Sequence, residues 1–122
     1  MPPPYHIIVA DDDAGIRALI ARVVAGTYPG VVISEAVDGD EALRIYSQYG
    51  ADLLITNNAM PHLSGEDLVK TLRARHVTIP IVMVSALPSQ AADALAAGVT
   101  RFLHKPFMLT ELVQVLTSLL PA

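Results

Sequence analysis

Short apolar runs alternate five times along the chain with longer stretches whose apolar residues recur at the spacing of one helical face. The short runs favour strands, and the longer stretches favour amphipathic helices. The fourth run is the most continuously apolar, which is typical of a strand that is covered on both faces. The predicted strands are residues 6–10, 31–33, 53–55, 79–84 and 101–103, and the predicted helices lie within 14–26, 38–50, 64–72, 88–97 and 109–120.

Capping residues support several of these boundaries. Asp38 and Glu41 have the spacing of a capping box, and Ser64 with Asp67 is a second helix-start signal. Pro88 can begin the fourth helix because its missing N–H is not needed in the first turn. Short connections between alternating strands and helices imply right-handed crossovers and a parallel sheet with helices on both faces. We therefore predict one α/β domain over residues 1–122, with residues 1–5 as a flexible N-terminal tail.

Composition excludes several classes of function. A chain of 122 residues that is 52% apolar can bury one core, and its net charge of -4 gives no electrostatic reason to bind nucleic acid. Without cysteine, disulfides, thiol nucleophiles and Cys-based zinc sites are impossible. No apolar run approaches the roughly 18 residues of a membrane span, and Met1–Pro4 lacks the features of a secretion signal. We expect a soluble, cytoplasmic protein with neither a nucleic-acid nor a membrane partner.

The candidate chemistry follows the carboxyl ends of the predicted strands, where open α/β folds bind their ligands. Carboxylates, an amide, a hydroxyl and a lysine meet there. Carboxylate oxygens suit Mg²⁺, while a lysine and a hydroxyl can contact phosphoryl oxygens. One aspartate, Asp13, is expected only to cap the first helix. The remaining candidates are Asp11, Asp12, Thr56, Asn57, Ser85 and Lys105.

In these residues and their order along the chain, the sequence resembles the receiver domain of two-component response regulators. The matching segments are residues 8–13 (Ile-Val-Ala-Asp-Asp-Asp), 52–61 (Asp-Leu-Leu-Ile-Thr-Asn-Asn-Ala-Met-Pro) with Gly65, 84–86 (Val-Ser-Ala) and 102–107 (Phe-Leu-His-Lys-Pro-Phe). Each segment alone is weak, but together they follow the family's order and spacing across essentially the whole chain. The resemblance implies a (βα)5 flavodoxin-like fold with strand order 2-1-3-4-5, a cis Lys105–Pro106 bond, and a signalling module that is not an enzyme.

The resemblance also implies a role for each matching residue. Lys105 corresponds to the lysine that contacts the phosphoryl group, and Asn57 stands where the family has its phosphoacceptor aspartate. The implied acidic pair is Asp11 and Asp12, the implied switch residues are Ser85 and Phe102, and the implied Mg²⁺ ligands are Asp12, Asn57 and the backbone carbonyl of Ala59.

Asn57 changes what this pocket is expected to do. A neutral amide lacks the nucleophilic carboxylate oxygen, and the loss of one negative charge weakens cation binding. We therefore predict no phosphoryl transfer to position 57, weak or absent Mg²⁺ binding, and pairing of Lys105 with Asp11 or Asp12.

Alternative interpretations of the amide remain open at this point. The chain can be a natural receiver-like domain that signals through protein contacts, or a conventional Mg²⁺-dependent regulator that carries an inactivating Asp-to-Asn substitution. Deamidation of Asn57 is a weaker explanation, because Asn58 follows it and not glycine. A flavodoxin-type binding protein of the same topology is a further alternative, although the acidic residues after the first strand are electrostatically wrong for its phosphate loop.

The resemblance also suggests partners. A sensor histidine kinase or another signalling protein is expected, together with a possible homodimer through a face formed by Ala94, Phe102 and Val115. Thr100 and Arg101 stand where one subfamily has an acidic pair, so we expect an apolar face in place of a salt-bridge network. The four histidines have no metal-ligand spacing, and His62 is expected to be solvated in its loop.

Overall fold

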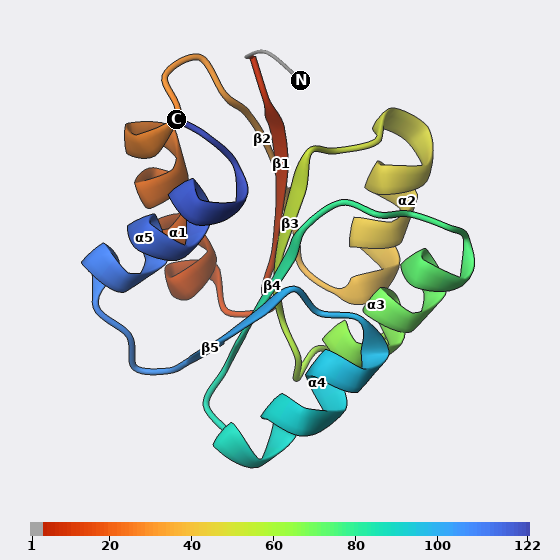
Figure 1. Ribbon diagram of the computed structural model, residues 1–122. Coiled ribbons are helices and arrows are strands. Elements are labelled where there is room, and N and C mark those ends of the chain that lie inside the picture. The colour runs from red at the N-terminus through yellow and green to blue at the C-terminus, as the bar shows by residue number, and fades with distance from the viewer. Residues whose placement is uncertain (1–3) are drawn as a thin grey trace.

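A computed structural model describes residues 4–122 as a parallel sheet with helices between its strands (Figure 1). The strand order is β2-β1-β3-β4-β5, so the predicted (βα)5 flavodoxin-like fold is confirmed. The strands are β1 (His6–Ala10), β2 (Val32–Ala36), β3 (Leu53–Asn57), β4 (Ile81–Ser85) and β5 (Arg101–His104). The helices are α1 (Ala14–Thr27), α2 (Gly39–Tyr49), α3 (Gly65–Ala74), α4 (Ala91–Ala97) and α5 (Leu109–Leu119), with a short 3-10 helix η1 (Pro88–Gln90) before α4.

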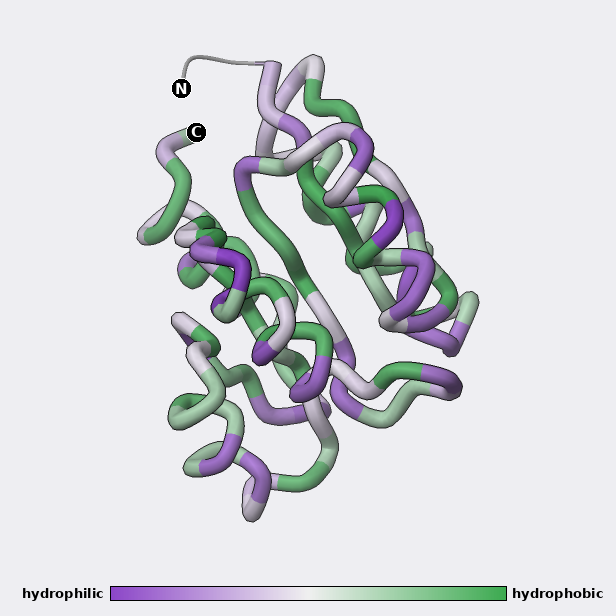
Figure 2. Tube along the Cα trace, turned by 90° about the vertical axis from the view of Figure 1, so that its right-hand side faces the viewer, coloured by the Kyte–Doolittle hydropathy of each residue, from purple (hydrophilic) through white to green (hydrophobic). Residues whose placement is uncertain are grey.

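The sheet lies between two layers of helices. Helices α1 and α5 cover one face, and α2, α3 and α4 cover the other (Figure 1). Because successive strand residues point to opposite faces, β1 contributes to both cores. Ile7 and Val9 join the cluster beneath α1 and α5, while Ile8 and Ala10 join the cluster on the opposite face. The central strands are correspondingly apolar, and hydrophilic segments gather on the outer turns of the helices and in the loops (Figure 2).

The parallel direction of the strands brings all their carboxyl ends to one edge of the sheet, the lower edge in Figure 1. The strand register pairs Ala10 with Thr56 and Asn57 with Val84. The loops that follow β1, β3 and β4 therefore start side by side. This edge, called the carboxyl rim below, is where a fold of this kind places its site.

Most predicted boundaries agree with the structure to within two residues, but β2 extends further than predicted. It continues through Ser34 and Glu35 to Ala36, and the sequence pattern ended it at residue 33. As an edge strand it can expose polar side chains, so its apolar run is shorter than the strand itself. The longest helix, α1, has 14 residues. Among residues 4–122 no helix combines the length and the apolar character that crossing a bilayer requires.

The predicted caps of α2 and α3 are confirmed. Asp38 Oδ1 accepts the Glu41 N–H at 2.8 Å, and Ser64 Oγ accepts the Asp67 N–H at 3.1 Å. Glu41 reaches back one residue further than a standard capping box, because its carboxylate accepts the Val37 N–H at 3.1 Å. Each cap satisfies an otherwise unpaired helix N–H and contributes about 1 kcal/mol.

The prediction of a flexible tail over residues 1–5 is wrong for Tyr5, while residues 1–3 lie outside the described part of the chain. Tyr5 is buried, and its hydroxyl donates to the Pro121 carbonyl at 2.8 Å. Its ring meets Tyr28 edge to face at 5.5 Å between centroids. The Tyr28 hydroxyl donates to the Leu120 carbonyl at 2.7 Å, and burial raises the pKa of Tyr28 to about 12. The two tyrosines thus fix both ends of the domain at the edge opposite the carboxyl rim.

Candidate functional site

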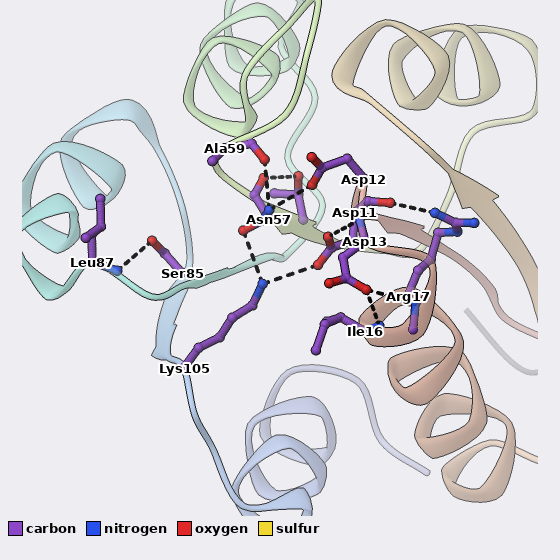
Figure 3. Close-up of polar contacts among 12 residues, drawn as sticks. Asp11, Asp12, Asp13, Ile16, Arg17, Asn57, Ala59, Ser85, Leu87 and Lys105 are labelled. Atoms are coloured by element: carbon purple, nitrogen blue, oxygen red, sulfur yellow. Dashed lines mark hydrogen bonds and ion pairs between the residues drawn. The ribbon is translucent and has the colours of Figure 1, made fainter.

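Four side chains from three strands meet at the carboxyl rim (Figure 3). Asp11 and Asp12 follow β1, Asn57 ends β3, and Lys105 follows β5. The sequence predicted this meeting, because parallel strands end at the same edge of the sheet. Asp12 is exposed, Asp11 is buried, and the other two side chains are partly buried.

Asp11 is held by bonds that leave its carboxylate little freedom. Its side chain is only 1% exposed, and its Oδ1 accepts the Asp13 N–H at 2.9 Å. Arg17 Nη1 donates to the Asp11 backbone carbonyl at 2.8 Å while Arg17 Nε pairs with Glu35 at 3.0 Å. Arg17 therefore holds the loop after β1 in place, a role that the sequence analysis missed because the residue reads as an ordinary polar position of α1.

Asp13 has the capping role that was predicted for it. Its Oδ1 accepts the Gly15 N–H at 2.9 Å and the Ile16 N–H at 3.1 Å. Figure 3 shows Asp13 beside Ile16 at the start of α1. The carboxylate thus satisfies two donors at the start of α1, where a negative charge is also favourable for the helix dipole. It belongs to the helix and not to the group of side chains around Asn57.

Lys105 bridges the first and third strands. Its Nζ lies 3.4 Å from Asp11 Oδ2 and 3.4 Å from Asn57 Oδ1 (Figure 3). The predicted pairing of this lysine with one of the two aspartates is confirmed, and the partner is Asp11. The contact with Asn57 was not predicted. The Lys105–Pro106 peptide bond is cis, as the resemblance implied.

The oxygen and the nitrogen of the Asn57 amide face different partners on its two sides. Its Oδ1 faces Lys105, as described above. Its Nδ2 donates to the Ala59 carbonyl at 2.9 Å and, over a longer distance of 3.4 Å, to Asp12 Oδ1 (Figure 3). The amide therefore contacts a lysine through its acceptor and two oxygen atoms through its donors.

The loop that carries Ala59 is tied to the start of α3. Asn58 Oδ1 accepts the Glu66 N–H at 2.8 Å, and the Asn58 carbonyl accepts the Gly65 N–H at 2.9 Å. A Cβ at position 65 would lie 2.2 Å from the Asn57 carbonyl oxygen, so only glycine fits without a backbone shift. The match of Gly65 to the family pattern thus has a steric cause.

A second tie joins the same loop to α2, and the sequence did not predict it. His62 Nδ1 lies 2.8 Å from Asp38 Oδ2, so Asp38 caps α2 with one oxygen and pairs with His62 through the other. These bonds, led by the one from the Glu41 N–H, hold the pKa of Asp38 below its ordinary value of 3.8. His62 is 68% exposed, as a solvated loop residue should be, but it is also paired and has a left-handed φ of 67°.

The side chains of the two predicted switch residues make no hydrogen bond to the side chains around Asn57, although the Lys105 N–H donates to the Ser85 carbonyl at 2.8 Å. Ser85 is buried, its hydroxyl donates to Gln90 Oε1 at 2.7 Å, and it accepts the Leu87 N–H at 3.2 Å. Phe102 is partly buried against the cluster beneath α2, α3 and α4. Gln90 is a further residue that sequence analysis missed, since a polar residue in a short helix gives no signal that it binds a strand-end hydroxyl.

The proposed dimer face needs one correction. Ala94 is 1% exposed and packs in the core of its own chain, so it offers no surface to a partner. The next residue, Leu95, is 52% exposed and is the apolar residue that α4 presents outward. Val115 lines a shallow hollow of about 260 Å³, which also contains Arg101 and Glu111. The face is therefore more charged than the sequence pattern indicated.

A second hollow adjoins the site. Its volume is about 320 Å³, and it lies where the start of α1 approaches the segment after β5. Its walls are mostly apolar, but Lys105 forms part of them. The residues that line it are Ile16, Leu19, Ala86, Lys105, Pro106 and Phe107.

The carboxyl rim brings together oxygen atoms from four residues. The oxygens available for a cation belong to Asp11, Asp12, Asn57 and the Ala59 carbonyl. In residues 4–122 no group of three or more histidine, cysteine, aspartate or glutamate side chains is arranged to hold a metal ion. Only two carboxylates converge, because position 57 contributes a neutral amide.

Comparison with protein families gives a match over nearly the whole chain. Residues 7–117 match the family described as response regulator receiver domain. The transcriptional regulatory protein PrrA of Mycobacterium leprae is 35% identical over 117 residues, which cover 94% of this chain and 49% of that protein. A protein-glutamate methylesterase/protein-glutamine glutaminase from a Nocardioides species is 32% identical over 108 residues, covering 85% of this chain and 30% of that protein. The chain thus spans about half the length of the first of these relatives and less of the second.

Solved structures agree with this match. The receiver domain of the Francisella response regulator 1452 superposes with a TM-score of 0.86 at 31% identity, covering 94% of this chain and 95% of that one. The chemotaxis response regulator CheY4 of Vibrio cholerae superposes with a TM-score of 0.85 at 28% identity, covering 95% and 98% respectively.

Proposed function

Because the chain belongs to the response regulator receiver family, we propose that it receives and passes on signals through protein contacts, without accepting a phosphoryl group at position 57. One observation carries the proposal. The side chain at the phosphoacceptor position is an amide whose oxygen is neutral and faces Lys105 at 3.4 Å. An aspartate attacks phosphorus with an anionic oxygen, whereas this amide has no such oxygen to offer.

A phosphodonor assay tests the proposal. The purified chain is incubated with acetyl phosphate and Mg²⁺, and its peptides are mapped by mass spectrometry. We expect no phosphoryl mass increment on the peptide that contains Asn57. Deamidation is followed in the same map, because conversion to aspartate would create an acceptor. A phosphoryl group on residue 57 of a chain that still carries asparagine would overturn the proposal.

The second candidate function is a conventional Mg²⁺-dependent receiver that carries an inactivating Asp-to-Asn substitution. It is favoured by the completeness of the surroundings, since Asp11, Asp12 and Lys105 all converge on position 57. The substitution Asn57→Asp separates the two candidates. Efficient Mg²⁺-dependent phosphorylation of this variant would favour the second candidate, and failure to accept phosphate would favour a natural receiver-like domain. The flavodoxin-type alternative has no comparable support, because the family match includes the acidic residues after β1.

The proposed partners follow from the family and from the surface. A sensor histidine kinase or another signalling protein of the cytoplasm is the proposed input partner. Association of two copies through α4, β5 and α5 is proposed in the corrected form, with Leu95 in place of Ala94 and with Phe102 and Val115 retained. Arg101 and Glu111 beside Val115 give this face opposite charges, so its association should weaken, but not disappear, as salt concentration rises.

A further inference from the structure

The amide nitrogen of Asn57 lies between oxygens from two separate segments of the chain. Nδ2 is 2.9 Å from the Ala59 carbonyl oxygen and 3.4 Å from Asp12 Oδ1. An amide nitrogen has two hydrogens and no lone pair to accept with, so both of its hydrogens find an oxygen here. Figure 3 shows Asn57 at the centre of these contacts, with Lys105 on its other side.

The neighbours determine which way this amide points. Rotating the amide by half a turn would aim its oxygen at two other oxygens and its NH₂ group at the Lys105 ammonium. Every contact in that arrangement would join like with like, donor with donor or acceptor with acceptor. The orientation with Nδ2 toward Asp12 and Ala59 is therefore the one that the hydrogen-bonding chemistry permits.

The same oxygens are those that the family resemblance assigns to Mg²⁺, and in this chain they do not fit the cation. Mg²⁺ needs oxygens about 2.0–2.1 Å away in near-octahedral geometry. Asp12 Oδ1 and the Ala59 carbonyl instead accept amide hydrogens, and the Asn57 oxygen faces Lys105. Asp11 offers no replacement, since Oδ1 accepts the Asp13 N–H and Oδ2 faces Lys105.

We infer that the Asn57 amide takes the place of a divalent cation, so that the loop after β3 is held in one conformation without metal. This inference rests on the proposed function, in which position 57 carries no phosphoryl group. The positive ends of two N–H dipoles meet the oxygens that a cation would otherwise bridge. The loop is then fixed at one end by Asn57 and at the other by the bonds from Gly65 and Glu66 to Asn58.

An aspartate at position 57 would reverse this arrangement. It would put one acceptor oxygen, where the Nδ2 donor now lies, against Asp12 Oδ1 and the Ala59 carbonyl, with no hydrogen between them. Without a cation, the oxygens would repel one another and the loop would lose both donors. With Mg²⁺ present, the added charge would favour the cation by Coulomb attraction. We thus expect this loop to be stabilised by Mg²⁺ when residue 57 is aspartate and to be unaffected by Mg²⁺ when it is asparagine.

The test measures thermal unfolding of the intact chain in EDTA and in millimolar Mg²⁺, with no phosphodonor. We expect the unfolding temperature of the Asn57 protein to be the same in both buffers. Asn57→Asp should unfold several degrees lower in EDTA and recover in Mg²⁺, and calorimetry should show that it binds Mg²⁺ on the order of 100-fold more tightly than the Asn57 protein. Gln48→Glu, which adds the same charge on the exposed surface of α2, should show no such recovery.

A second variant distinguishes the effect of losing the amide N–H donors from the effect of adding a negative charge at position 57. Asn57→Ala removes both donors without adding an anion, so its unfolding temperature should fall equally in both buffers. Hydrogen exchange of residues 58–64 should accelerate in this variant, but in the Asn57 protein it should be unaffected by Mg²⁺. If Asn57→Asp does not fold in EDTA, refolding in Mg²⁺ gives the same answer.

Two results would overturn the inference. One is a rise in the unfolding temperature of the Asn57 protein with Mg²⁺ that equals the rise of Asn57→Asp. The other is an Asn57→Ala variant as stable in EDTA as the Asn57 protein, with unchanged exchange of the loop. Neither result involves phosphorylation, so this inference can fail while the proposed function stands. Conversely, phosphate on Asn57 would overturn the proposed function and leave the metal-free measurements unchanged.

Discussion

The two halves of the carboxyl rim are built very differently. In the β3–α3 half, residues 57–66, side-chain and backbone bonds recur at almost every step. In the β4–α4 half, residues 86–97, a 3-10 turn leads into a seven-residue helix that has no side-chain cap. Leu87 and Leu95 there are 55% and 52% exposed, and only Ala94 of α4 is buried.

This difference indicates which half is fixed and which is available to partners. Segments with few buried apolar contacts and few polar ties open at low free energy. The β3–α3 half holds the position that would receive a phosphoryl group, and in this chain it is already bonded through Asn57. The β4–α4 half is tied mainly through Ser85 and Gln90. If the chain signals through protein contacts, as proposed above, we expect its adaptable surface to lie in the β4–α4 half.

The largest effect on stability is expected when one methyl group is added at Gly65 in the β3–α3 half. A Cβ at position 65 would lie 2.2 Å from the Asn57 carbonyl oxygen, so Gly65→Ala must displace backbone. We expect the free energy of unfolding, measured by urea denaturation, to fall by about 2–4 kcal/mol. Gly26→Ala in α1 is the matched control, because nothing lies within 4 Å of its added Cβ. It should be neutral or stabilising by up to about 1 kcal/mol. Equal losses in the two variants would contradict a special close approach at Gly65.

The next effect concerns Asp38, which ties α2 to the β3–α3 half. Asp38→Ala removes the cap and the His62 partner together, so the free energy of unfolding should fall by about 1–2 kcal/mol. The native pKa of Asp38 lies below its ordinary value of 3.8, so near that pH Asp38 binds fewer protons in the folded state than in the unfolded state. The contribution of Asp38 to stability is therefore fully present above the unfolded-state pKa, near 3.8, and is lost as the pH falls through the lower native pKa.

The pH dependence supplies the control for this prediction. Asp38→Asn keeps an effective cap but cannot titrate, so stability measured from pH 6 to pH 2 should fall less steeply than in the unmodified protein. If stability falls as steeply between pH 6 and pH 2 in Asp38→Asn as in the unmodified protein, Asp38 is not one of the carboxylates whose protonation destabilises the fold.

A smaller effect on stability is expected from substitutions at the starts of α3 and α4. Ser64→Ala removes the cap of α3 and should lower the free energy of unfolding by about 1 kcal/mol. Gln90→Ala at the start of α4 removes no cap bond, so its cost should be less than about 0.5 kcal/mol. The second substitution should instead release the Ser85 hydroxyl, which hydrogen exchange in residues 86–91 would report. A loss from Gln90→Ala as large as that from Ser64→Ala would show that α4 is tied as firmly as α3.

The smallest effect on stability is expected at Leu95. Its side chain is 52% exposed, so Leu95→Ala should change the free energy of unfolding by no more than about 0.5 kcal/mol. If this surface associates, the same substitution should weaken association in analytical ultracentrifugation. Leu19→Ala is the control, because Leu19 is also exposed, at 39%, but lies on α1. Equal loss of association in both variants would argue against a specific role for the α4 surface.

Much of the site could be predicted because it depends on strand ends. Asp11, Asn57 and Lys105 each follow an apolar run, and a parallel sheet must bring such positions to one edge. The roles of Asp13 and Ser64 as caps could be predicted because a cap acts within three residues of itself. In these cases the interaction partner is close in sequence or is set by the topology.

Other contacts could not be predicted because their partners depend on how loops fold back. The pairing of His62 with Asp38 spans 24 residues and requires a left-handed φ at His62. The inward position of Ala94 was also missed, since an alanine-rich helix has too little contrast between its faces to show which one is buried. The flexible-tail prediction failed at Tyr5 because its hydrogen-bond partner, Pro121, lies at the other end of the chain.

The sequence by itself determined the fold class, the strand ends that form the carboxyl rim, and the absence of a carboxylate at position 57. Hydrophobic periodicity and residue identity suffice for these, because they are local properties of the chain. Only the tertiary structure decided what the asparagine does there. Its two N–H groups found oxygens on Asp12 and Ala59, and its oxygen found Lys105. An amide differs from a carboxylate by the partners it can satisfy, and those partners are brought to it by three strands of the folded sheet.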